Sequence, residues 1–180
     1  YHWTIDVLPG LAWAGPLGES VQQGVVGVAR PDALTTEVTQ TSANAVVNWH
    51  SFSVGGEEYV KFVQPGANAA ILNRVVGGSE SQILGRIDAN GRVFLVNPQG
   101  VYFGAGARVD ASAFAASTLD IADEDFMNGR YVFTKGTGSA DRVVENHGEI
   151  VADQFVALLG DRVSNEGLVQ ARLGTVALGA

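Results

Sequence analysis

The chain has 180 residues, which is the size of one domain that can bury a substantial core. Its 11 basic and 19 acidic residues give a formal net charge of -8, which argues against a nucleic acid or an anionic membrane surface as the main partner. The absence of cysteine excludes a disulfide scaffold and a thiolate metal site, and no apolar run is long enough for insertion into a membrane as a helix.

The first 60 residues lack a clean repeat. Residues 5–14 are apolar and end in Ala12-Trp13-Ala14, a small-x-small pattern typical of signal cleavage sites, but the positive flank of a signal peptide is missing. Residues 1–15 are therefore interpreted either as the remnant of a leader or as an N-terminal extension. Residues from about 16 to 60 contain alternating stretches, and we predict that they form a β cap over one end of the core.

Residues 83–104 predict short β-strands separated by turns. Apolar and polar residues alternate over residues 83–89, as on the two faces of a strand, and Asn90-Gly91 is a turn dipeptide. Each residue of the next turn suits a type I turn at its position, which predicts strands over residues 93–96 and 101–103 on either side of it: Asn97, Pro98, Gln99 and Gly100.

Two segments near the C-terminus repeat at an interval of 19 residues (163 minus 144). The six matching pairs are Val144 and Val163, Asn146 and Asn165, Gly148 and Gly167, Ile150 and Val169, Ala152 and Ala171, and Gly160 and Gly179. Residues 87–89 and 109–111 match at an interval of 22 (109 minus 87). Such periods, with 23 glycines available for corners, are typical of a solenoid of short strands. We therefore predict an all-β fold, a right-handed parallel β-helix with coils over about residues 60–180, as part of a longer solenoid.

Residue patterns for catalysis or metal binding are weak. The histidines His2, His50 and His147 fall in no known motif, and His147 is interpreted as a solvent-facing residue at a repeat corner, where its counterpart is Glu166. The acidic cluster over residues 120–125 lacks the spacing of a calcium loop and is interpreted as a solvated loop. We predict no catalytic residue, no metal site and no cofactor, and therefore no enzymatic activity.

Six motifs, in fixed order over about three quarters of the chain, resemble the secretion domain of two-partner secretion (TPS) exoproteins. These motifs are AVVNWHSFSVG, FVQPGANAAILNRVVGG, GRIDANGRVFLVNPQGVYFGAGARVDA, ASTLDIADEDFMNGRYVF, VENHGEIVA and VSNEGLVQA. The resemblance is to the filamentous-haemagglutinin-type family, and most of all to its high-molecular-weight-adhesin branch. It implies a right-handed β-helix with an N-terminal cap, at the mature N-terminus of a large exoprotein of a Gram-negative bacterium.

The resemblance also implies a partner and a route. The partner is an outer-membrane β-barrel transporter of the TpsB type, which recognises the secretion domain through its periplasmic polypeptide-transport-associated (POTRA) domains. The exoprotein passes through the periplasm and is secreted or stays at the cell surface, where the domain nucleates folding of the β-helix. We expect a monomer without nucleic-acid binding or membrane insertion.

The resemblance assigns candidate residues for this targeting role. The NPNG turn of the family corresponds to Asn97, Pro98, Gln99 and Gly100, with Gln at the third position. Further candidates within the matched motifs are Asn73, Arg74 and Arg86. The NPNL motif of some members has no match, since residues 64–68 are QPGAN.

Two other function classes stay open at this point. One is a β-helical carbohydrate-active enzyme, which would need a groove with convergent carboxylates and basic residues. The other is an adhesin module that itself binds a ligand, whose mark would be an exposed aromatic row; Trp3, Trp13 and Trp49 are not spaced as one.

Overall fold

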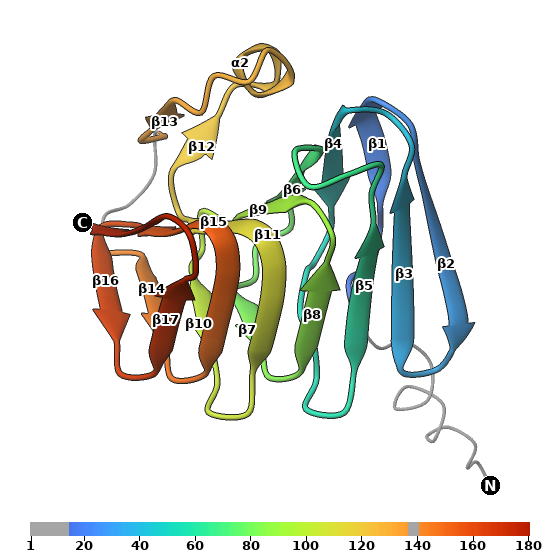
Figure 1. Ribbon diagram of the computed structural model, residues 1–180. Helices are drawn as coiled ribbons and strands as arrows, with labels where there is room; N and C mark the ends of the chain where they lie inside the picture. The colour runs from blue at the N-terminus through green and yellow to red at the C-terminus, as the bar shows by residue number, and fades with distance from the viewer. Residues whose placement is uncertain (1–14, 137–140) are drawn as a thin grey trace, which may run out of the picture.

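The computed structural model describes residues 15–136 and 141–180, which form a rod of stacked β-coils (Figure 1). The interpretation of residues 1–15 as a leader remnant or an extension therefore lies outside the described residues, except for Gly15. Strands of successive coils pair in parallel, and the coils have three faces. The predicted right-handed parallel β-helix is confirmed.

Each face of the rod is a stack of parallel strands, one from each coil. The first face carries β3 (Thr35–Gln40), β5 (Tyr59–Val63), β8 (Arg86–Ala89), the first halves of β11 (Arg108–Ser117) and β15 (Glu149–Leu159), and β17 (Leu168–Ala171). The second face carries β4 (Asn44–Trp49), β6 (Ala70–Val75), β9 (Arg92–Val96), the second halves of β11 and β15, and β18 (Thr175–Gly179). The third face carries β7 (Ser81–Ile83), β10 (Val101–Phe103), β14 (Val143–Asn146) and β16 (Arg162–Asn165).

Two antiparallel strands cover the N-terminal end of the rod. β1 (Ser20–Gln23) pairs with β4, and β2 (Val26–Asp32) pairs with β3, so both edges of the first coil are blunted. An ion pair of 2.9 Å between Glu19 Oε1 and Arg30 Nη2 joins the start of β1 to β2. Parallel pairing already begins at Thr35, so the segment from there to residue 60, which the sequence assigned to the cap, forms the first coil.

Strand register confirms the repeat that the sequence contains. Val144 pairs with Val163 and Ile150 with Val169, at the predicted interval of 19, and Ile87 pairs with Val109 at the interval of 22. On the second face the interval becomes 20, because Phe155 pairs with Thr175. The corner between β17 and β18 holds one residue more than the corner in β15. Gly179 therefore pairs with Leu159, one position before the predicted Gly160.

The alternation over residues 83–89 belongs to two strands, not one. β7 ends at Ile83 and β8 begins at Arg86, and the chain turns a corner between them. A Cβ on Gly85 would overlap the carbonyl oxygen of Gly55, so only glycine permits this close approach of the neighbouring coil. The alternation survives the corner because Ile83 and Ile87 both point into the core.

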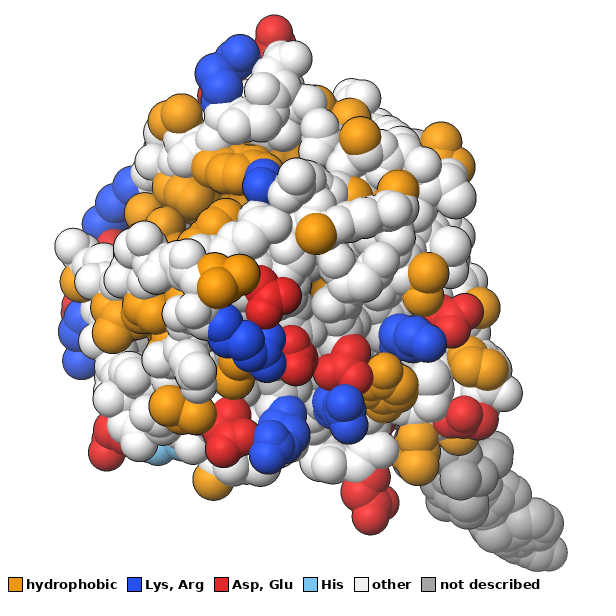
Figure 2. Space-filling model, in the orientation of Figure 1, with side chains coloured by type: hydrophobic (Ala, Val, Ile, Leu, Met, Phe, Trp, Pro, Cys, Tyr) orange, Lys and Arg blue, Asp and Glu red, His pale blue; other side chains and the backbone are white. Residues whose placement is uncertain are grey.

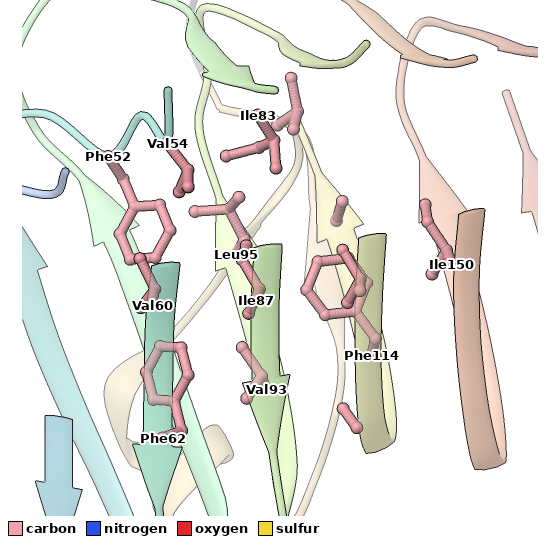
Figure 3. Packing of buried hydrophobic residues seen from close by; sticks show 14 of the residues in the cluster. Phe52, Val54, Val60, Phe62, Ile83, Ile87, Val93, Leu95, Phe114 and Ile150 are labelled. Carbon is pink, nitrogen blue, oxygen red and sulfur yellow. The ribbon is translucent and has the colours of Figure 1, made fainter. Parts of the chain in front are cut away.

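The core lies between the three faces and consists of aliphatic and aromatic side chains. Phe62, Ile87, Leu95, Phe114 and Ile150 all point into it (Figure 3). Among the described residues, no helix is long and apolar enough to cross a membrane.

The second face is apolar on its outer side as well. An excursion between β11 and β14 folds back over it, with β12 (Asp120–Ile121), α2 (Asp123–Met127) and β13 (Phe133–Thr134) (Figure 1). The side chains of the outer layer, which we call the outer stripe, are Val46, Ala70, Leu72, Phe94, Val96 and Ala115. Phe126 of the excursion packs edge-on against Phe94 with ring centroids 5.1 Å apart. Because both sides of the sheet are covered here, β9 and the second half of β11 are buried almost without interruption.

Candidate functional site

The predicted turn follows β9 at the corner that leads to the third face. The amide nitrogen of Gly100 donates to the carbonyl oxygen of Asn97 at 3.0 Å, and that of Gln99 donates to Asn97 Oδ1 at 2.9 Å. Gln99 keeps a negative φ, as in a type I turn and unlike a type II turn, whereas Gly100 has φ +117°. The side chain of Asn97 therefore closes the turn, as its residue type predicted.

Asn97 also joins three coils. Its Nδ2 donates to the Ser79 carbonyl oxygen and to Ser81 Oγ of the preceding coil, each at 2.9 Å. Its amide nitrogen donates to the Ser117 carbonyl oxygen of the following coil, also at 2.9 Å. The residue is fully buried, while Pro98 is exposed and Gln99 is half-exposed. In the folded domain, a partner can therefore reach only the tip of the turn.

Asn73 lies inside the second face and is equally inaccessible. Its Oδ1 accepts a hydrogen bond of 3.0 Å from Trp49 Nε1, and its Nδ2 donates to the Phe94 carbonyl oxygen at 3.1 Å. These partners belong to the coils before and after it, in β4 and β9. Asn73 thus satisfies the indole nitrogen of a buried tryptophan and aligns three coils.

Arg74 points to the outer side of the same face, where it holds the excursion. Its guanidinium contacts Asp120 Oδ1 at 2.9 Å, Asp123 Oδ1 at 2.7 Å and the Ile121 carbonyl oxygen at 2.6 Å. Burial lowers the pKa of Arg74, but the hydrogen bonds to both carboxylates outweigh it, so that the pKa is raised overall. The acidic segment, which the sequence suggested to be a solvated loop, is therefore docked on the rod.

Arg86 lies apart from these residues, on the outer side of the first face. Its Nε and Nη2 contact Asp88 Oδ2 at 2.9 and 2.8 Å, and its guanidinium lies 5.6 Å from the ring centroid of Tyr59. Its side chain is 60% exposed. Lys, Arg, Asp and Glu side chains gather over this face (Figure 2). Of the seven predicted residues, Arg86 and Pro98 are therefore exposed in the folded state, Arg74 and Gln99 are partly exposed, and the other three are buried.

Comparison with known proteins decides the family. A family model of the TPS secretion domain matches residues 15–180. This chain is a TPS secretion domain. The crystal structure of the HMW1 secretion domain from Haemophilus influenzae has the same fold, with a TM-score of 0.85 and 33% sequence identity, over 92% of this chain and 45% of that one.

Two curated relatives of this TPS domain are heme/hemopexin-binding proteins of Haemophilus influenzae. The protein of strain Rd is 39% identical over 165 residues, which cover 87% of this chain and 18% of the relative. The second is 35% identical over 156 residues, which cover 77% of this chain and 17% of the relative. The chain thus spans under a fifth of the length of these relatives.

Sequence reasoning did not foresee which residues of the TPS domain cooperate with Arg74. Asp120 and Asp123 are 46 and 49 positions further along the chain (120 minus 74, 123 minus 74). The available signal was an arginine on a largely apolar strand, together with an acidic run flanked by the apolar residues Ile121 and Phe126. An arginine on such a strand needs a carboxylate as a partner, and the two apolar residues beside the acidic run need an apolar surface to pack against.

Proposed function

We propose that this TPS domain directs the exoprotein of which it is part to a cognate outer-membrane β-barrel transporter and starts β-helix folding outside the cell. The single observation that carries the proposal is the family match over residues 15–180. TPS exoproteins are secreted through an outer-membrane transporter of their own. The finer steps proposed for this chain are recognition by POTRA domains in the periplasm and release to the medium or display at the cell surface.

We propose further that the transporter recognises the chain before it has folded. Asn73 and Asn97 belong to the matched motifs, yet both have no exposed surface in the folded domain. A POTRA domain can contact these side chains only while the coils are open, and an extended segment can add a strand to the edge of a sheet. Once folded, the same amides bond within the rod and are withdrawn from the transporter.

The two ends of the rod support a direction for the subsequent folding. The N-terminal end is closed by β1 and β2. At the other end, β17 and β18 each have a partner on one side, and the core-facing Val176 and Leu178 of β18 are 40% and 48% exposed. A following coil would bury these side chains and pair with these edges, so each coil serves as the template for the next.

A binding experiment tests recognition of the unfolded chain. Purified POTRA domains of the cognate transporter are titrated with the folded domain and with Ile87→Asp, which places a carboxylate in the core and prevents folding. The proposal expects at least tenfold tighter binding of the unfolded variant, with a further loss when Asn97→Ala is added to it. Equal or tighter binding of the folded domain, reduced by Pro98→Ala together with Gln99→Ala, would refute it.

The activity of the whole exoprotein is a separate proposal. Its relatives carry the name heme/hemopexin-binding protein, and this chain spans only 18% and 17% of them. We propose that the secretion domain has no enzymatic activity and that any ligand binding resides elsewhere in the exoprotein. The family match gives no support to a carbohydrate-active enzyme or to an adhesin module. An exoprotein whose secretion domain alone bound heme would contradict this division.

A further inference from the structure

Three potential metal ligands meet at the corner between the third and first faces, near the C-terminal end of the rod. His147 Nε2 lies 2.5 Å from Glu145 Oε2 and 3.7 Å from Glu166 Oε2. One ligand atom from each residue lies within 4.8 Å of the other two. The histidine was expected to face the solvent at a turn, but its side chain is only 28% exposed.

Neighbouring coils hold these three residues in place. Glu145 and His147 flank the fully buried Asn146, whose Oδ1 accepts a hydrogen bond of 2.9 Å from the Gly148 amide. The His147 amide donates to the Phe103 carbonyl oxygen at 2.8 Å. Glu166 occupies the position of His147 one coil later, and its amide donates to the Asn146 carbonyl oxygen at 2.8 Å. The backbone under all three ligands is therefore fixed by coil stacking.

The charges at this corner favour a cation. Glu145 and Glu166 converge on one imidazole nitrogen, and among the described residues neither carboxylate has an ion pair with Lys or Arg. Arg108, which lines the same surface hollow as His147, is paired with Glu149 at 2.6 Å. A divalent cation would neutralise two carboxylates in a domain whose net charge is -8.

We propose that Glu145, His147 and Glu166 form a zinc site that clips two consecutive coils together. Imidazole and carboxylate are zinc ligands, and bond lengths near 2.0 Å place the ligand atoms of a tetrahedral site roughly 3.3 Å apart. The side chain of Glu166 is 67% exposed and has the freedom to close the 3.7 Å separation. The site is open to solvent, so water supplies the fourth ligand. Zinc binds the lone pair of Nε2, so that this nitrogen carries no proton in the metal-bound state.

The clip would act only on the folded rod. Its ligands come from both sides of the β14–β16 step, so that the site exists once the two coils have stacked. A ligand that binds the folded state and not the unfolded one stabilises the fold in proportion to the logarithm of its concentration over Kd. Zinc would therefore strengthen the end of the rod farthest from the N-terminal cap without obstructing passage of the unfolded chain.

The test is calorimetric titration of the untagged, EDTA-treated domain with zinc chloride. One zinc is expected to bind per chain, with loss of measurable binding in His147→Ala and at least tenfold weaker binding in Glu166→Gln. His50→Ala and His2→Ala serve as controls and should keep wild-type affinity. Zinc should also raise the melting temperature of the wild type and leave that of His147→Ala unchanged.

Several results would overturn the proposal. These are the absence of binding by the wild-type domain at 100-fold molar excess of zinc, wild-type affinity in His147→Ala, or loss of binding in His50→Ala. In the first case, the cluster is an imidazole hydrogen-bonded to Glu145, with the Glu166 carboxylate 3.7 Å away, and nothing more. Glu166→Gln changes an exposed side chain and keeps the test decisive if His147→Ala fails to fold; wild-type affinity in that variant then refutes the clip.

Discussion

Replacement of Asn97 by alanine tests the central role of the predicted turn. The side chain accepts one hydrogen bond from the Gln99 amide and donates two, to the Ser79 carbonyl oxygen and to Ser81 Oγ. Each such bond contributes about 0.5–1.5 kcal/mol net, and loss of a buried partner costs more. The Gln99 amide can turn to water because the residue is half-exposed, whereas Ser81 is fully buried. We therefore expect Asn97→Ala to lower the free energy of unfolding by about 2–3 kcal/mol.

The assay is thermal or urea unfolding of the purified domain, with secretion measured in parallel. For a domain of this size, the expected loss of stability corresponds to a decrease of the melting temperature of roughly 4–12 °C. Pro98→Ala is the matched control, since the ring is exposed and its removal costs at most about 1 kcal/mol through the unfolded state. Secretion should fall in Asn97→Ala and in the double variant with Pro98→Ala. A stability loss below about 0.5 kcal/mol in Asn97→Ala would show that the amide does not fix the coil register.

Three further predictions concern other contacts of the rod. Arg74→Ala should lower the free energy of unfolding by about 2–3 kcal/mol and speed amide hydrogen exchange over residues 119–128. Arg86→Ala, the control, should change the free energy of unfolding by less than about 0.5 kcal/mol. Equal effects of the two substitutions would refute the docking role of Arg74. Glu19→Gln should be less stable than the wild type at pH 7, because the hydrogen bond from Arg30 lowers the pKa of Glu19 from 4.5. This contribution to stability is present above pH 4.5 and disappears as the pH falls through the lowered pKa. The melting temperatures of the variant and the wild type, measured from about pH 7 to about pH 3, should therefore converge at the acidic end. Gly85→Ala should destabilise by about 3 kcal/mol in urea unfolding, because its Cβ meets two carbonyl oxygens, whereas Gly56→Ala, with open space around it, should be neutral within about 0.5 kcal/mol.

The repeat was predictable because each coil needs the same types of residue at its core positions and at its corners. Val144 and Val163 fill the same place in successive core layers, and Asn146 and Asn165 turn the same corner, where the two amides are joined by a hydrogen bond of 2.9 Å. A fixed interval in the sequence therefore translates directly into strand register. The interval breaks where one corner gains a residue, as it does before Thr175, and a single inserted residue leaves no mark in composition.

The candidate site was less predictable, because residue type does not report accessibility inside a solenoid. Asn73 and Asn97 were candidates for the targeting role because they lie in the matched motifs, yet both amides are buried and bond to main-chain groups. The pairing of Arg74 with Asp120 joins residues 46 positions apart and depends on the return of the excursion (120 minus 74). The cluster around His147 forms only through the stacking of two coils.

The outer stripe has a consequence for any shortened version of the domain. Val46, Leu72 and Phe94 belong to the first three coils, but the residues that shield them come from the excursion, beyond residue 120. Asn44 of the first coil also depends on the excursion for a hydrogen-bond partner, since its Nδ2 donates to the Met127 carbonyl oxygen 83 positions away. A truncation after the third coil would thus leave this apolar surface exposed to solvent on coils that are otherwise complete, and such a fragment should aggregate. The smallest fragment that folds on its own must therefore include the excursion, whatever its number of coils.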